Sequence, residues 1–99
     1  MSETMLMSAT GQQDVLELFV NKVRVKGIHK NHQFDIFLRD ISAILFVHAT
    51  GVIPGSIEFF FSGAGLLEHK FNHITFSTEQ QPQFDKIREA IENMIIEGD

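Results

Sequence analysis

The sequence lacks cysteine, tryptophan and tyrosine, and it has only two prolines among its 99 residues. Without cysteine, neither a disulfide framework nor a thiolate metal site can form. A reducing, cytoplasmic setting fits this composition. All ten aromatic residues are phenylalanines. Because phenylalanine has no polar group, we expect most of these rings to lie in a hydrophobic core.

Positive charge and long apolar runs are also scarce. Eight Lys and Arg residues against thirteen Asp and Glu residues give a net charge of −5. That balance disfavours direct nucleic-acid binding, which draws most of its affinity from neutralising phosphates. No apolar run approaches the length of a transmembrane helix, and the first residues lack the basic and apolar regions of a signal peptide. The composition predicts one globular domain over residues 14–97, preceded by a flexible tail over residues 1–13.

Alternating apolar and polar residues predict a series of short strands. The stretch 53–62 is expected to be central, because Ile57, Phe59 and Phe61 share one face between two glycine-containing turns. The pattern over 41–47 is apolar on both faces, which indicates a strand covered on both sides. The predicted strands occupy residues 15–20, 23–26, 34–39, 41–47, 53–62, 66–71 and 72–76.

The C-terminal stretch predicts a helix from about residue 81 to residue 96. Thr78 and Gln81 have the spacing of a capping box. Apolar residues recur there at helical spacing, with charged residues on the other face; they are Phe84, Ile87, Ile91, Met94 and Ile95. The predicted fold is therefore mainly β: a partly open, seven-stranded antiparallel barrel capped by one amphipathic helix.

Four segments carry a family resemblance: Phe-Asp-Ile-Phe-Leu-Arg-Asp-Ile-Ser-Ala-Ile (34–44), Gly-Ser-Ile-Glu-Phe (55–59), Asn-His-Ile-Thr-Phe (72–76) and Gln-Phe-Asp-Lys-Ile-Arg-Glu-Ala-Ile-Glu (83–92). With the order of elements, they make residues 15–97 resemble the small bacterial pleckstrin-homology-like domains. The resemblance implies the barrel fold and an adaptor-like role. In the uncharacterised group that this chain resembles, a short C-terminal oligomerisation segment often follows the domain. We expect that segment to be absent here, because the sequence stops at Asp99.

A basic stretch is a candidate anion-binding site. Half of the Lys and Arg residues lie between residues 22 and 30, and three of them alternate on one face of a predicted strand. In pleckstrin-homology domains that bind phosphoinositides, basic residues around the first hairpin hold the headgroup, so the resemblance implies a similar role here. The alternative is a solvated strand face. The candidate residues are Lys22, Arg24, Lys26, His29 and Lys30.

Neither a metal site, a cofactor site nor a catalytic site is predicted. The five histidines have no zinc-motif spacing; they are His29, His32, His48, His69 and His73. Gly63-Ala64-Gly65 is too short for a dinucleotide loop, and a hairpin turn explains it better. The serines and carboxylates lie in no nucleophile-elbow or paired-carboxylate context. We therefore expect no enzymatic activity.

Four apolar residues lie out of phase with the expected core positions of their strands: Phe37, Ile44, Phe46 and Phe60. Either the helix and loops cover them, or they form an exposed patch that binds a partner or a second copy. The favoured hypothesis is a non-catalytic protein-interaction module of bacterial or phage origin that also self-associates. The alternative is a small acidic phage- or plasmid-type inhibitor that blocks a nucleic-acid-binding host protein. A second alternative is the binding of an anionic lipid or headgroup by the basic stretch.

Overall fold

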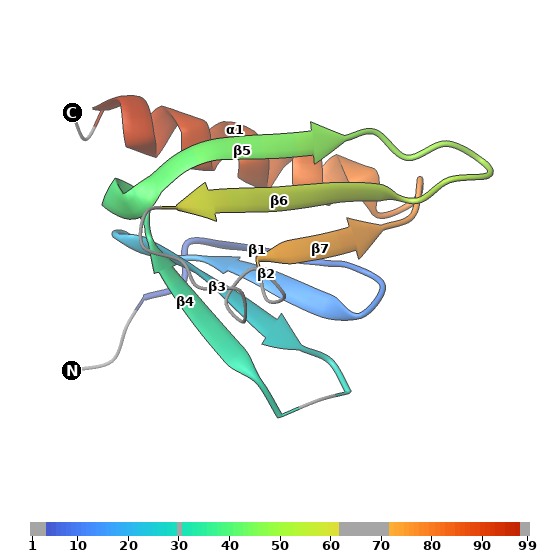
Figure 1. Cartoon of the computed structure of the whole chain (residues 1–99), viewed down its shortest axis with the longest axis horizontal. Coiled ribbons are helices and arrows are strands. Elements are labelled where there is room, and N and C mark those ends of the chain that lie inside the picture. Colours follow the sequence, from blue (N-terminus) through green and yellow to red (C-terminus); the bar gives the residue numbers. More distant parts are fainter. Residues whose placement is uncertain (1–3, 30, 62–71, 98–99) are drawn as a thin grey trace.

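A computed structural model describes residues 4–29, 31–61 and 72–97, and it contains two antiparallel sheets and one helix (Figure 1). The four-stranded sheet has the order β1 (Met7–Thr10), β2 (Asp14–Leu18), β3 (Lys22–Gly27) and β4 (Gln33–Phe37). The three-stranded sheet has the order β5 (Ile41–Val47), β6 (Gly55–Phe61) and β7 (His73–Phe76). Helix α1 (Gln81–Glu97) follows the last strand.

The fold prediction is confirmed in its coarse outline. The described residues are mainly β, with seven strands and a C-terminal helix. However, these strands form two separate sheets and not a single closed barrel. The chain passes from one sheet to the other through a short 3-10 helix, η1 (Leu38–Asp40), where buried Leu38 donates its backbone N–H to the carbonyl oxygen of Asn21 at 2.9 Å.

The flexible tail predicted over residues 1–13 contains a strand that the sequence analysis did not predict, since residues 7–10 form β1. Met7 pairs with Leu18, and Ala9 pairs with Leu16. Ala9 is fully buried, whereas Ser8 and Thr10 are exposed. A four-residue strand with one small core residue leaves little apolar periodicity in the sequence. The strand predicted over residues 66–71 lies outside the described residues.

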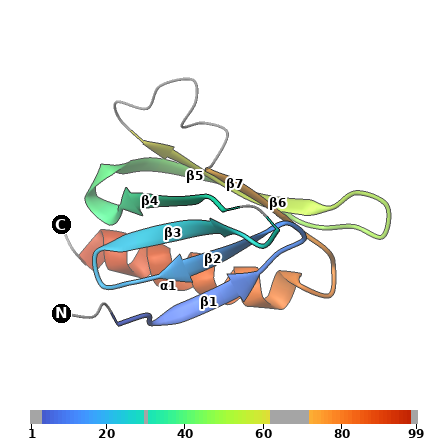
Figure 2. The ribbon, with the colours of Figure 1, turned by 90° about the horizontal axis from the view of Figure 1, so that it is seen from below.

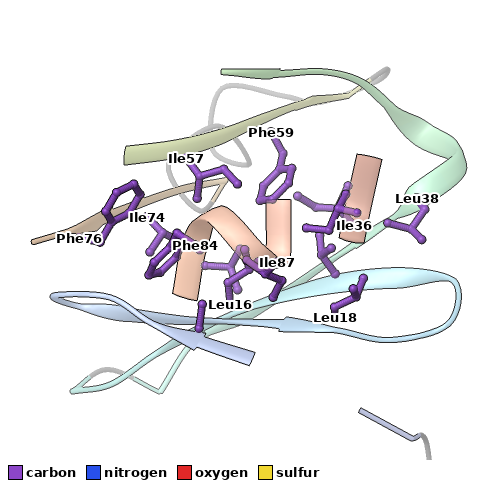
Figure 3. Packing of buried hydrophobic residues seen from close by; sticks show 14 residues of the cluster. Leu16, Leu18, Ile36, Leu38, Ile57, Phe59, Ile74, Phe76, Phe84 and Ile87 are labelled. Atoms are coloured by element: carbon purple, nitrogen blue, oxygen red, sulfur yellow. The ribbon is translucent and has the colours of Figure 1, made fainter. Parts of the chain in front are cut away.

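The core lies between the two sheets and α1 (Figure 3). From α1, Phe84, Ile87 and Ile91 are fully buried, as the helical spacing predicts. The Phe84 ring stacks on that of Phe76, with 4.4 Å between the ring centroids. Figure 2 shows α1 running behind β1, β2 and β3. The helix thus covers the inner face of the four-stranded sheet and also closes the core beside the three-stranded one.

The helix begins at Gln81, close to the predicted position, but its capping residues differ by one position. Ser77 donates its backbone N–H to Oε1 of Gln80 at 2.9 Å, and Gln80 donates its backbone N–H to Oγ of Ser77 at 3.2 Å. This reciprocal pair is a capping box. Ser77 and Gln80 therefore take the places that the sequence analysis gave to Thr78 and Gln81.

Candidate functional site

Asp35 on β4 holds two of the five basic candidates. It lies across from Arg24 of β3. Arg24 donates hydrogen bonds to the Asp35 carboxylate from Nε at 2.8 Å and from Nη2 at 3.2 Å. Lys22 donates to the same carboxylate at 3.0 Å. The Arg24 hydrogen bonds are the strongest influence on the pKa of Asp35 and hold it below its ordinary value; burial opposes them, and Lys22 adds to the lowering. Part of the positive charge on β3 is therefore neutralised within the sheet.

Arg24 and Lys22 also cover an aromatic ring. Phe19, which follows β2, is only 6% exposed. The Arg24 guanidinium carbon lies 4.8 Å from the centroid of this ring, and Lys22 Nζ lies 5.5 Å from it. Contacts of this kind are attractive, because the ring face carries a partial negative charge. The two cations thus serve to pack the outer face of the four-stranded sheet.

The remaining basic candidates have a different setting. Lys26 and His29 are exposed, and Lys30 lies outside the described residues. An anionic ligand at this hairpin would have to compete with Asp35 for Lys22 and Arg24. The geometry is that of a structural ion-pair cluster with exposed charge at its margin.

Two of the four apolar candidates, Ile44 and Phe46, face the core. A β-bulge near the start of β5 shifts the phase of the strand. Ile44 therefore pairs with buried Phe59, and Phe46 pairs with buried Ile57. Both side chains pack against the core cluster, so the assignment of these two residues to the outer face is corrected.

Phe46 is further enclosed by aromatic and cationic neighbours. Its ring centroid lies 5.4 Å from that of Phe76. The guanidinium carbon of Arg88, from α1, lies 4.5 Å from the Phe46 centroid. Arg88 Nε is buried and has no hydrogen-bond partner among the described residues. Arg88 thus joins α1 to β5 through its contact with the ring.

The other two apolar candidates lie in different places. Phe37 is 43% exposed at the end of β4, and the Arg39 guanidinium carbon lies 5.6 Å from its ring centroid. Phe60 is half-buried on β6, across from Ala43 on the outer face of the three-stranded sheet. Phe37 borders a pocket of about 440 Å³ whose other lining residues are Val20, Asn21, Leu38, Arg39, Ile41, Met94 and Ile95. The four candidates therefore do not form one patch.

A different set of apolar residues is exposed on β5 and on the loop that follows it. We call it the β5 surface, and it consists of Ala43, Leu45, Val47, Val52 and Ile53. The exposed fractions are 49% for Leu45, 41% for Val47, 93% for Val52 and 61% for Ile53, and Ala43 is also exposed.

The β5 surface is not predicted from the sequence, because strict alternation from Ile41 places Ala43, Leu45 and Val47 inside. The bulge reverses that assignment after Ser42. The available signal was the strand's apolar character on both faces. That signal does not say which face is covered.

A groove separates the start of β5 from the C-terminal half of α1. Its volume is about 440 Å³, and it lies beside the edge of the three-stranded sheet. Its lining residues are Ile41, Ser42, Ala43, Ile44, Glu92, Ile95 and Ile96. Ile96 is 71% exposed at the rim. The groove is mainly apolar, and among the described residues that line it only Glu92 is charged.

Two histidines, His32 and His48, make local contacts. His48 Nδ1 lies 2.9 Å from Gln81 Nε2, and His32 Nε2 lies 3.3 Å from Asp14 Oδ1. Within residues 4–29, 31–61 and 72–97, no three His, Asp or Glu side chains gather as metal ligands would. No helix in those ranges has the length and apolar composition required to cross a bilayer.

Comparison with protein-family models, with curated proteins and with solved structures finds no match to this chain.

Proposed function

We propose that this chain is a non-catalytic protein-interaction module that binds through the β5 surface. The observation that carries the proposal is the exposure of four large apolar side chains, Leu45, Val47, Val52 and Ile53, on one edge strand of the described sheet and the loop that follows it. Apolar side chains that are exposed as a group mark interaction sites, whereas scattered ones do not. An edge strand adds unpaired backbone groups, which favour pairing with another chain.

The proposal includes a pleckstrin-homology-like fold. A four-stranded sheet, a three-stranded sheet and a C-terminal helix follow one another in the described residues, and this order supports the resemblance. An adaptor-like role agrees with it. Such architectures carry many functions, so the fold alone does not name a partner. The interaction role therefore rests on the β5 surface.

A second candidate is the acidic inhibitor, which one observation favours. Asp85, Glu89 and Glu92 follow one another at helical spacing on α1, and the latter two are exposed. The buried side of α1 faces the inner side of the four-stranded sheet (Figure 3), whereas Lys22 and Arg24 lie on its outer side. The acidic face of the helix is thus opposite the basic hairpin.

One capture experiment tests both candidates. Wild-type protein, a Leu45→Lys/Val47→Lys variant and a Glu89→Lys/Glu92→Lys variant are immobilised and exposed to a lysate of the source organism, with light scattering of each protein alone in parallel. The interaction proposal predicts that a retained partner, or self-association, is lost in the Leu45→Lys/Val47→Lys variant only. The inhibitor predicts a nucleic-acid-binding partner that elutes at low salt and is lost in the Glu89→Lys/Glu92→Lys variant only. A monomer that retains the same proteins with and without the β5 substitutions contradicts the interaction proposal.

A further inference from the structure

The backbone of β5 has hydrogen-bonding groups that point away from its own sheet. Phe59 donates its N–H to the carbonyl oxygen of Asn72, so its backbone polar groups face β7. Residues alternate in an antiparallel ladder, so the polar groups of Glu58 and Phe60 face β5; Ser42 Oγ donates to the carbonyl oxygen of Phe60 in agreement with this. Glu58 pairs with Leu45. The backbone N–H and C=O groups of Leu45 therefore form hydrogen bonds with β6.

The backbone polar groups of the two residues beside Leu45 point in the opposite direction. The N–H and C=O groups of Ile44 and Phe46 point outward from the edge of the sheet. Their side chains face the core, because in a strand the side chains point out of the sheet, at right angles to the N–H and C=O groups. Among the described residues, neither backbone bonds to a segment outside the sheet. Ile44 and Phe46, whose backbone polar groups point outward, thus flank Leu45.

The edge formed by β5 is less protected than the other edges in the described ranges. On β1, Thr10 donates its N–H to Oε1 of Gln83 at 3.1 Å. On β7, Thr75 accepts a hydrogen bond from the backbone N–H of Gln12 at 2.9 Å. β4 is five residues long and carries Asp35. β5 has seven residues without charge or proline, the two devices that commonly keep edge strands apart.

We propose that β5 pairs antiparallel with β5 of a second copy, with Leu45 on the two-fold axis. The inference rests on the proposed interaction role and assigns its partner. In this register, Ile44 of one copy lies across from Phe46 of the other, and their outward N–H and C=O groups form the hydrogen bonds. The two three-stranded sheets then become one continuous six-stranded sheet. The contact is isologous, so it closes as a dimer.

The exposed side chains of β5 fit this register. Leu45 meets Leu45 of the second copy, and Ala43 meets Val47, so exposed apolar groups cover one another. The bulge lies at the margin and does not interrupt the four central hydrogen bonds. His48 of the second copy lies across from Ser42, beside the groove that Glu92 lines.

Cysteine cross-linking tests the register directly, because the natural sequence has no cysteine. Across the axis, Leu45→Cys places two Cα atoms about 4.5 Å apart, as in a non-hydrogen-bonded antiparallel pair. That separation is within the range of a disulfide. Val47→Cys is the matched control, since Val47 is on the same face with similar exposure. The Cα atoms of residue 47 in the two copies would be about 14 Å apart, because they are separated by four residues along the strand direction.

Under mild oxidation, we expect the Leu45→Cys variant to form a covalent dimer and the Val47→Cys variant to stay monomeric. A mixture of the Ala43→Cys and Val47→Cys variants should give the heterodimer, because these positions face each other. Cross-linking of Val47→Cys alone as fast as Leu45→Cys, or of neither variant, overturns the self-pairing. If Leu45→Cys does not cross-link but wild type retains a foreign protein that Leu45→Lys loses, the proposed function stands and the second copy is the wrong partner.

Discussion

Arg24 and Asp35 form a two-point ion pair between β3 and β4, with donor–acceptor distances of 2.8 and 3.2 Å. Paired guanidinium and carboxylate groups of this geometry are among the strongest hydrogen-bonded pairs in proteins. Lys22 shares the same carboxylate. The cluster therefore stabilises the sheet, and an anionic ligand at this hairpin would meet Lys22 and Arg24 already paired with Asp35.

Replacing Asp35 should destabilise the fold. In Asp35→Asn, Lys22 and Arg24 still lie over the Phe19 ring, but they lose the carboxylate that pairs with them. Lys22 is only 9% exposed. Leaving a partly buried charge without its partner costs about 1–3 kcal/mol. Urea unfolding at neutral pH measures this loss, with the exposed Asp40→Asn as the control. Equal stability of the two variants would mean that the cluster contributes nothing.

The same substitution should change the response to acid. The pKa of Asp35 is lower in the folded state than its ordinary value of 3.8, so the unfolded state binds this proton first as the pH falls. The contribution of ionised Asp35 to the free energy of unfolding is full when the pH is above the ordinary pKa. It is lost as the pH falls through the lowered pKa of the folded state. Below about pH 4, wild type should therefore lose stability more steeply than Asp35→Asn. Parallel acid unfolding curves would contradict the assignment.

Truncation in the core should show that α1 closes the fold. Phe84 is fully buried and stacks on Phe76. Phe84→Ala should lower the free energy of unfolding by about 3–5 kcal/mol. The exposed Lys86→Ala on the same helix should change it by less than about 0.5 kcal/mol. Thermal unfolding of Phe84→Ala that matches wild type would exclude this packing.

Two glycines near β6 form a matched pair for substitution by alanine. A Cβ added to Gly55 would meet the Phe76 ring, and it would lie 2.6 Å from the Val47 carbonyl oxygen. Backbone atoms of a sheet cannot move aside cheaply, so Gly55→Ala should cost about 1–3 kcal/mol. A Cβ on Gly51 meets no atom within 4 Å, so Gly51→Ala should be tolerated. Equal melting temperatures for the two variants would contradict the close approach at Gly55.

Hydrogen exchange measured by NMR should distinguish the outward amides of β5. The amides of Ile44 and Phe46 should exchange rapidly in dilute protein and become protected as the concentration rises, because pairing with a second copy occupies them. The Leu45 amide, bonded to β6, should be protected throughout. The Val20 amide in the exposed β2–β3 turn is the control for bulk effects. Concentration-independent exchange at Ile44 and Phe46 would argue against edge pairing.

The sequence predicts most of the strands and the helix, because their periodic patterns are strong. It predicts burial correctly for Ile57, Phe59 and Phe84, each of which has a clear period. It fails at β1, where only Ala9 faces the core fully buried. A strand of this length is recognised by its pairing with β2, which is a long-range property.

The candidate site was less predictable for a definite physical reason. One extra residue at the bulge of β5 reverses every later side chain on that strand. Ile44 and Phe46 thereby move to the core, and Leu45 and Val47 move to the surface. An apolar run without polar markers does not reveal such a shift. The role of Asp35 in holding Lys22 and Arg24 likewise depends on register between strands, which the spacing of the basic residues does not contain.

Sedimentation velocity across a concentration series tests the central claim most directly. Wild type should pass from monomer to dimer, and Leu45→Lys should remain monomeric with unchanged circular dichroism, because two ammonium groups would meet at the axis. Val20→Lys, at an exposed apolar position outside the β5 surface, should dimerise as wild type does. Dimerisation of Leu45→Lys with wild-type affinity, or a wild-type monomer at every concentration that also retains no protein partner, would contradict the account.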